Sequence, residues 1–124
     1  MNDKPLIEAI RNSPGGFGLD GRYYPAAMLL LGMDLAKSGG LFRGFEEWLA
    51  VQKQELSSFS WPKEIFREAI PEVRPGEWRQ PLSPEQEQRA MDHLFSRVLA
   101  FLDVRNDREA LYHMYVDYRT LRGR

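Results

Sequence analysis

Proline and glycine divide this sequence into short segments, and within the segments apolar residues recur at helical spacing. The clearest segment follows Ser83-Pro84-Glu85-Gln86. Serine suits a helix N-cap, proline suits the first helical position, and glutamine three residues after the serine can close a capping box. The apolar residues that follow lie three or four positions apart, which predicts an amphipathic helix: Met91, Leu94, Phe95, Val98 and Leu102.

The same reasoning predicts an all-α fold for the whole chain. Helices are expected over residues 4–12, 25–37, 42–56, 62–70 and 84–104, with a last helix that Asp107 caps and that reaches Leu121. The 25–37 segment is apolar almost all round, which is typical of a buried central helix. The link before the last helix is short, so we expect the two C-terminal helices to form an antiparallel hairpin. We predict a single compact domain, 1–124, of five or six helices.

Length and composition exclude several classes of protein. A chain of 124 residues fits one domain, and the absence of cysteine excludes disulfides and thiolate metal sites. The apolar run from Ala26 to Leu31 is too short to span a bilayer, and Asp3 and Glu8 stand where a signal peptide would carry basic residues. We therefore expect a soluble cytoplasmic domain with no membrane contact.

Charge argues against a nucleic-acid partner. The 17 basic and 18 acidic side chains give a net charge of −1. They are interleaved along the chain rather than gathered in the basic stripe that phosphate contacts need. The arginines at the C-terminal end are typical of a helix terminus, where cations complement the helix dipole.

Gly16 to Gly21 matches the spacing G-x-G-x-x-G, which in dinucleotide-binding proteins joins a strand to a helix. A helix-like segment precedes it here, so we interpret it as a loop that needs unusual backbone angles. The two histidines, His93 and His113, have no partner at metal-binding spacing. We expect no metal or cofactor, and we interpret Glu64 and Glu68 as part of an exposed charged helix face.

One segment resembles a known group of proteins. The runs Gly18-Leu19-Asp20-Gly21, Gly32-Met33-Asp34 and Gly39-Gly40-Leu41-Phe42-Arg43-Gly44-Phe45-Glu46-Glu47-Trp48-Leu49 are similar to small bacterial α-helical proteins of the polymorphic-toxin immunity type. The resemblance covers residues 14–50. It implies a helical fold and a role without catalysis. Gly44 is expected to allow close helix approach, with Phe45, Trp48 and Leu49 packing on the helix that contains Leu29–Leu31.

Three functions follow as hypotheses. The first is a non-enzymatic protein that binds another protein, such as a basic toxin domain, through acidic and aromatic side chains. Its expected contact residues are Glu46, Glu47, Glu72, Glu77 and Trp78.

The second hypothesis is a small enzyme or ligand-binding protein with a pocket under the Gly15–Gly21 loop. Its candidate residues are Asp20, Asp34, His93 and His113. The third is a structural subunit that forms homo-oligomers through exposed aromatic residues.

Overall fold

The computed structural model describes residues 3–124, and within this range every regular element is helical. The prediction of one all-α domain is confirmed. The elements are α1 (Lys4–Asn12), η1 (Pro14–Phe17), α2 (Tyr23–Ala36), α3 (Phe45–Lys53), α4 (Trp61–Ala69), η2 (Pro75–Glu77), α5 (Pro84–Arg105) and α6 (Arg108–Arg122). None of the helices within 3–124 is both long enough and apolar enough to cross a membrane.

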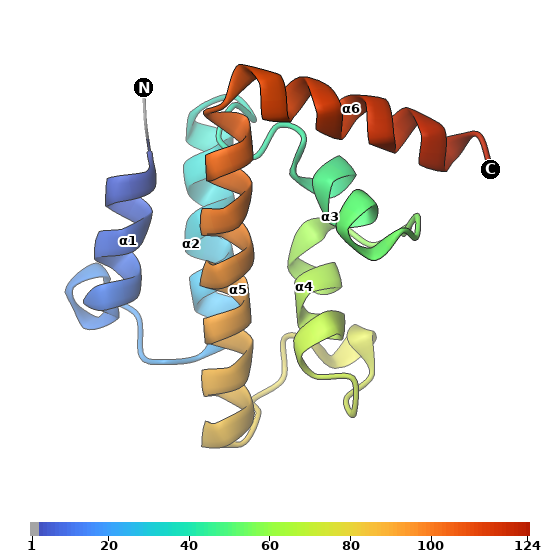
Figure 1. The fold of residues 1–124 in the computed structure, drawn as a ribbon. Coiled ribbons are helices and arrows are strands. Elements are labelled where there is room, and N and C mark those ends of the chain that lie inside the picture. Colours follow the sequence, from blue (N-terminus) through green and yellow to red (C-terminus); the bar gives the residue numbers. More distant parts are fainter. Residues whose placement is uncertain (1–2) are drawn as a thin grey trace.

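Helix α5 is the centre of the fold. Helices α1, α2 and α4 all pack against it, and α6 continues from its end (Figure 1). It begins with the capping box that the sequence predicts: Ser83 Oγ accepts from the N–H of Gln86, and the Gln86 side chain accepts from the N–H of Ser83. Its inward side chains are buried, among them Leu94, Val98 and Leu102, each with no exposed surface.

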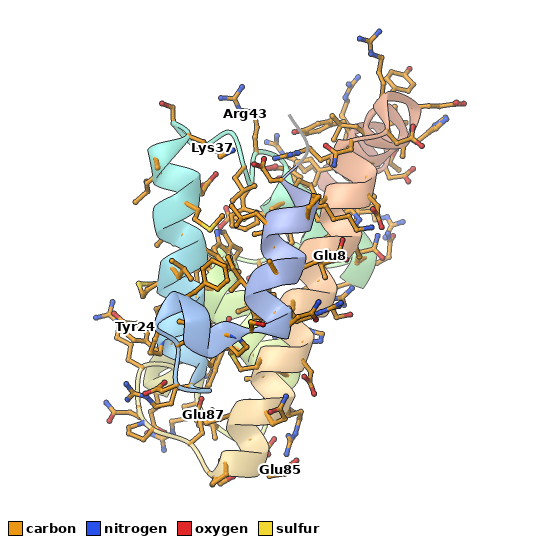
Figure 2. The ribbon with its side chains drawn as sticks, turned by 90° about the vertical axis from the view of Figure 1, so that its left-hand side faces the viewer. Glu8, Tyr24, Lys37, Arg43, Glu85 and Glu87 are labelled. Carbon is orange, nitrogen blue, oxygen red and sulfur yellow. The ribbon has the colours of Figure 1, made fainter. Side chains whose placement is uncertain are left out.

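The expected position of the 25–37 helix is only partly correct. One face of α2 is buried, through Tyr23, Ala26, Ala27 and Leu30. The opposite face lies at the edge of the molecule with no helix outside it (Figure 2), and the Leu35 side chain there is 69% exposed. Although α2 is apolar almost all round, other helices cover only one of its faces, because α5 occupies the centre of the fold.

The two C-terminal helices also differ from expectation. The link between them is short, as predicted, and Asp107 caps α6 by accepting from the N–H groups of Glu109 and Ala110. However, α6 crosses the end of α5 at a steep angle instead of lying antiparallel along it (Figure 1). Its most extensive helix contact is with α3.

Five aromatic rings join α3, α4 and α5. Phe45 lies at their centre, with its ring centroid 5.2 Å from Phe42, 6.0 Å from Trp48, 5.6 Å from Trp61 and 5.0 Å from Phe101. Phe45 has no exposed surface. The Gly-Phe-x-x-Trp-Leu element thus packs against α4, α5 and α6, not against the Leu29–Leu31 helix as expected.

Two helices, α2 and α4, are capped at their N-termini by a carboxylate from elsewhere in the chain. At the start of α2, Glu87 Oε2 accepts from the N–H of Tyr23 at 2.6 Å. At the start of α4, Glu46 Oε2 accepts from the N–H of Trp61 at 2.8 Å. A carboxylate from a different helix therefore satisfies a free N–H group at each N-terminus, where the helix dipole also favours negative charge.

Candidate binding groove between α3, α4 and α6

Two adjacent cavities form a groove beside the N-termini of α3 and α4. The enclosed chamber, 120 Å³, lies between α3, α4, the loop that joins them and Tyr118 of α6. The open chamber, 610 Å³, lies between the end of α2, the residues before α3, the start of α4 and Tyr115 of α6. Both chambers are lined by Glu46, Glu47 and Trp61. We call the pair the α3–α4–α6 groove.

Glu46 and Glu47, two of the predicted contact residues, stand at the junction of the chambers. One oxygen of Glu46 is occupied by the N–H of Trp61. Glu47 is half-buried and makes no hydrogen bond or ion pair with the described residues. A carboxylate held in a groove without a partner is available for a cationic group from outside the chain.

Tyr115 forms the wall opposite α3, and Gly44 makes its position possible. Gly44 has a φ of +91°, and a Cβ atom built there would lie 2.7 Å from the Tyr115 hydroxyl oxygen. Glycine at this position therefore allows α6 to approach closely. Burial, and next the negative charge of Glu47, raise the pKa of the Tyr115 hydroxyl, while the positive charge of Arg43 opposes them.

Beneath the enclosed chamber, Glu64 is held in a buried ion-pair network. Its side chain is 3% exposed. Arg67 donates to both of its oxygens, at 2.8 and 2.9 Å, and Lys53 Nζ lies 2.5 Å from Oε1. Burial opposes ionisation of Glu64, but these cationic partners outweigh it and lower its pKa to about 2. At the floor of the chamber, one carboxylate is thus neutralised by two cations.

Glu68 extends this network to α5. Its Oε1 lies 2.6 Å from His93 Nε2 and 3.2 Å from Arg97 Nε, and its Oε2 lies 3.5 Å from Lys53 Nζ. Burial would raise the pKa of Glu68, but the hydrogen bond with His93 and the charge of Arg97 lower it. The expectation that Glu64 and Glu68 form an exposed charged face is therefore wrong. Lys53 of α3 contacts both carboxylates; Arg67 of α4 completes the pairing of Glu64, and His93 and Arg97 of α5 complete that of Glu68.

The other predicted contact residues lie outside the groove. Glu72 pairs with Arg89 at 2.9 Å. Glu77 is exposed on η2. Trp78 is 9% exposed, and its ring packs edge-on against Tyr24, with 5.1 Å between the ring centroids, which anchors the 71–82 loop. This packing leaves little of Trp78 for a partner to contact.

The structure does not assemble the residues proposed for an enzyme or ligand pocket. Asp20 is exposed and pairs with Arg22. Asp34 accepts from the N–H of Phe42 at 2.8 Å. His93 pairs with Glu68 on one side of α5, whereas His113 is exposed on α6.

The Gly15–Gly21 segment is a turn in which Gly18 adopts a φ of +80°, as a glycine loop allows. Within residues 3–124 no group of three or more acidic or histidine side chains is placed to hold a metal ion.

Sequence reasoning missed the α6 side of the groove. Tyr115 and Tyr118 share a helix face with buried Met114, so helical spacing alone predicts that they belong to the core. Tyrosine often packs its ring against apolar neighbours and turns its hydroxyl toward water. Two tyrosines at the edge of an apolar helix face are the sequence signal that could have indicated a groove wall. This signal does not indicate which helix the tyrosines contact.

Comparisons with family models, with curated proteins and with solved structures find no match to this chain. The groove itself therefore supplies the argument for function.

Proposed function

We propose that this protein is a non-enzymatic protein-binding protein that seats a basic segment of a partner in the α3–α4–α6 groove. The carrying observation is Glu47, a half-buried carboxylate without a partner at the junction of two cavities. The open chamber is large enough for a polypeptide segment, and aromatic residues of the kind found at binding hot spots line the groove.

The charges of the residues that line the groove favour a basic partner. Apart from Glu64, which Lys53 and Arg67 neutralise, three carboxylates (Asp34, Glu46, Glu47) line the two chambers against one further cation, Arg43. Such an excess accelerates association with a positively charged surface and disfavours acidic partners. An immunity protein that neutralises a basic toxin domain is the specific form of this function that we propose.

The test is capture of partners from cells that express the tagged protein. We expect one stoichiometric basic protein whose capture is lost in Glu47→Lys and kept in the matched control Glu77→Lys, because Glu77 lies outside the groove. For the immunity form, the partner alone should arrest growth, and wild type but not Glu47→Lys should restore it. Equal capture by both variants would contradict the proposal.

A self-associating subunit is the second candidate function, and the outer face of α2 favours it. This face carries no charged residue, and it contains Pro25, Met28, Leu29, Gly32, Leu35 and Ala36. A second copy of this protein packed there would cover the apolar face of α2 that a single chain leaves exposed. Light scattering of wild type and Leu35→Lys tests it, since only a dimer through α2 would dissociate in the variant.

A further inference from the structure

The enclosed chamber of the groove is too small for most cofactors. Its 120 Å³ is well below the roughly 300 Å³ at which pockets for small molecules begin. It shares Glu46, Glu47 and Trp61 with the larger chamber, which can hold the main chain of a bound segment. The geometry suits one side chain that enters from a segment lying in the open chamber.

The charges of the chamber select a cation. Lys53 and Arg67 neutralise Glu64, and the N–H of Trp61 takes one oxygen of Glu46. Among residues 3–124, none makes a hydrogen bond or an ion pair with either oxygen of Glu47. An anionic or neutral side chain would leave this carboxylate unpaired in a partly desolvated place, which is costly.

The lining of the chamber favours a planar cation over a compact one. Phe59, Trp61 and Tyr118 line the chamber. Within this chain, the guanidinium of Arg67 lies 5.7 Å and the ammonium of Lys63 5.3 Å from the ring centroid of Phe59. The guanidinium of Arg122 lies 6.0 Å from the ring centroid of Tyr118. Both rings therefore take part in cation–π contacts, and the preference for a planar cation comes from the hydrogen bonds that it can make to Glu47. A guanidinium can stack on a ring and also bind a carboxylate through two parallel hydrogen bonds, whereas an ammonium acts as a point charge.

We propose that the enclosed chamber binds the side chain of a single arginine from the basic partner. Its guanidinium pairs with Glu47 and stacks against the aromatic lining, while the neighbouring residues of the partner lie in the open chamber. This inference rests on the proposed function and adds to it the residue type that the site recognises.

The probe is N-acetyl-arginine amide, titrated into the intact ¹⁵N-labelled protein and followed by NMR. We expect saturable shifts in the amides of Glu47 and Ser57 and in the Trp61 indole, because these residues line the chamber. The citrulline amide, which keeps the shape without the charge, should bind about tenfold more weakly, and the lysine amide should also bind more weakly. Equal affinities for the arginine and citrulline amides, or shifts confined to other surfaces, would overturn the inference.

A pair of variants distinguishes binding in the enclosed chamber from a general effect of the protein's charge. Glu47→Gln should weaken binding of arginine amide about tenfold, whereas Glu77→Gln, which removes the same charge outside the groove, should leave it unchanged. Partner capture that depends on Glu47 with no arginine preference would refute this inference and leave the proposed function standing. Specific arginine binding without any captured partner would support the chamber and refute the proposed function.

Discussion

Glu87 on α5 accepts the backbone N–H of Tyr23, the first residue of α2, with 2.6 Å between Oε2 and N. Its other oxygen accepts from the N–H of Leu82 at 3.1 Å. Glu87 is 8% exposed, and it lies at the end of the molecule where α2 begins (Figure 2). One side chain of the central helix thus fixes the start of another helix and the end of the 71–82 loop.

Replacing Glu87 by alanine should lower the free energy of unfolding by about 1–3 kcal/mol, because a buried N–H group and a part-buried one lose their acceptor. Urea denaturation measures the change. The control is Glu85→Ala on the same helix. Its carboxylate is 72% exposed and pairs with Arg89, so its loss should cost under about 1 kcal/mol. Equal costs for the two variants would show that the contact to Tyr23 does not stabilise the fold.

Glu64 predicts a pH dependence of stability. Its pKa is lowered in the folded protein from 4.5 to about 2, so its contribution is complete above about pH 4.5 and is lost as the pH falls toward 2. The shift corresponds to about 3 kcal/mol. The difference in unfolding free energy between wild type and Glu64→Gln should shrink by about this amount between pH 6 and pH 2. A difference that stays constant over this range would show that Glu64 is not ionised within the network.

Gly44 and Tyr115 should be energetically coupled. Gly44→Ala introduces a Cβ at a φ of +91° and 2.7 Å from the Tyr115 hydroxyl oxygen, so it should cost more than about 1 kcal/mol. In a Tyr115→Phe background the cost should be smaller, because the crowding oxygen is gone. Gly16→Ala is the control, since its added Cβ would contact nothing. Additive effects at Gly44 and Tyr115 would contradict the close contact.

The two faces of α2 should respond differently to substitution. Leu30 has no exposed surface, so Leu30→Ala should cost about 2–5 kcal/mol. Leu35 is 69% exposed, so Leu35→Ala should change the unfolding free energy by less than about 0.5 kcal/mol. Thermal and urea unfolding measure both changes. A large loss in the Leu35 variant would mean that this face is already covered.

The sequence was sufficient to predict the helices but not how they meet. Prolines, glycines and apolar spacing are local signals, and they placed α1 over its observed residues, Lys4–Asn12. The start of α2 at Tyr23 could not be found in this way, because its capping group, Glu87, lies 64 residues away. The steep crossing of α6 depends on Gly44 and the ring of Tyr115, which interact across the fold.

The candidate site was predicted only in part, because it also depends on contacts between residues distant in sequence. Glu46 and Glu47 were expected to contact a partner, and both line the groove. The spacing of Glu64 and Glu68 suggested that both side chains lie on an exposed face of their helix. Their burial depends on Lys53 and on cations of α5, whose proximity no local pattern reveals.

The central claim is that a partner occupies the α3–α4–α6 groove. Hydrogen exchange of the captured complex, compared with the free protein, tests it most directly. We predict that protection increases in residues 42–47, 57–61 and 115–118, which line the groove. Protection confined to the outer face of α2 or to the 71–82 loop, with the groove unchanged, would contradict the claim.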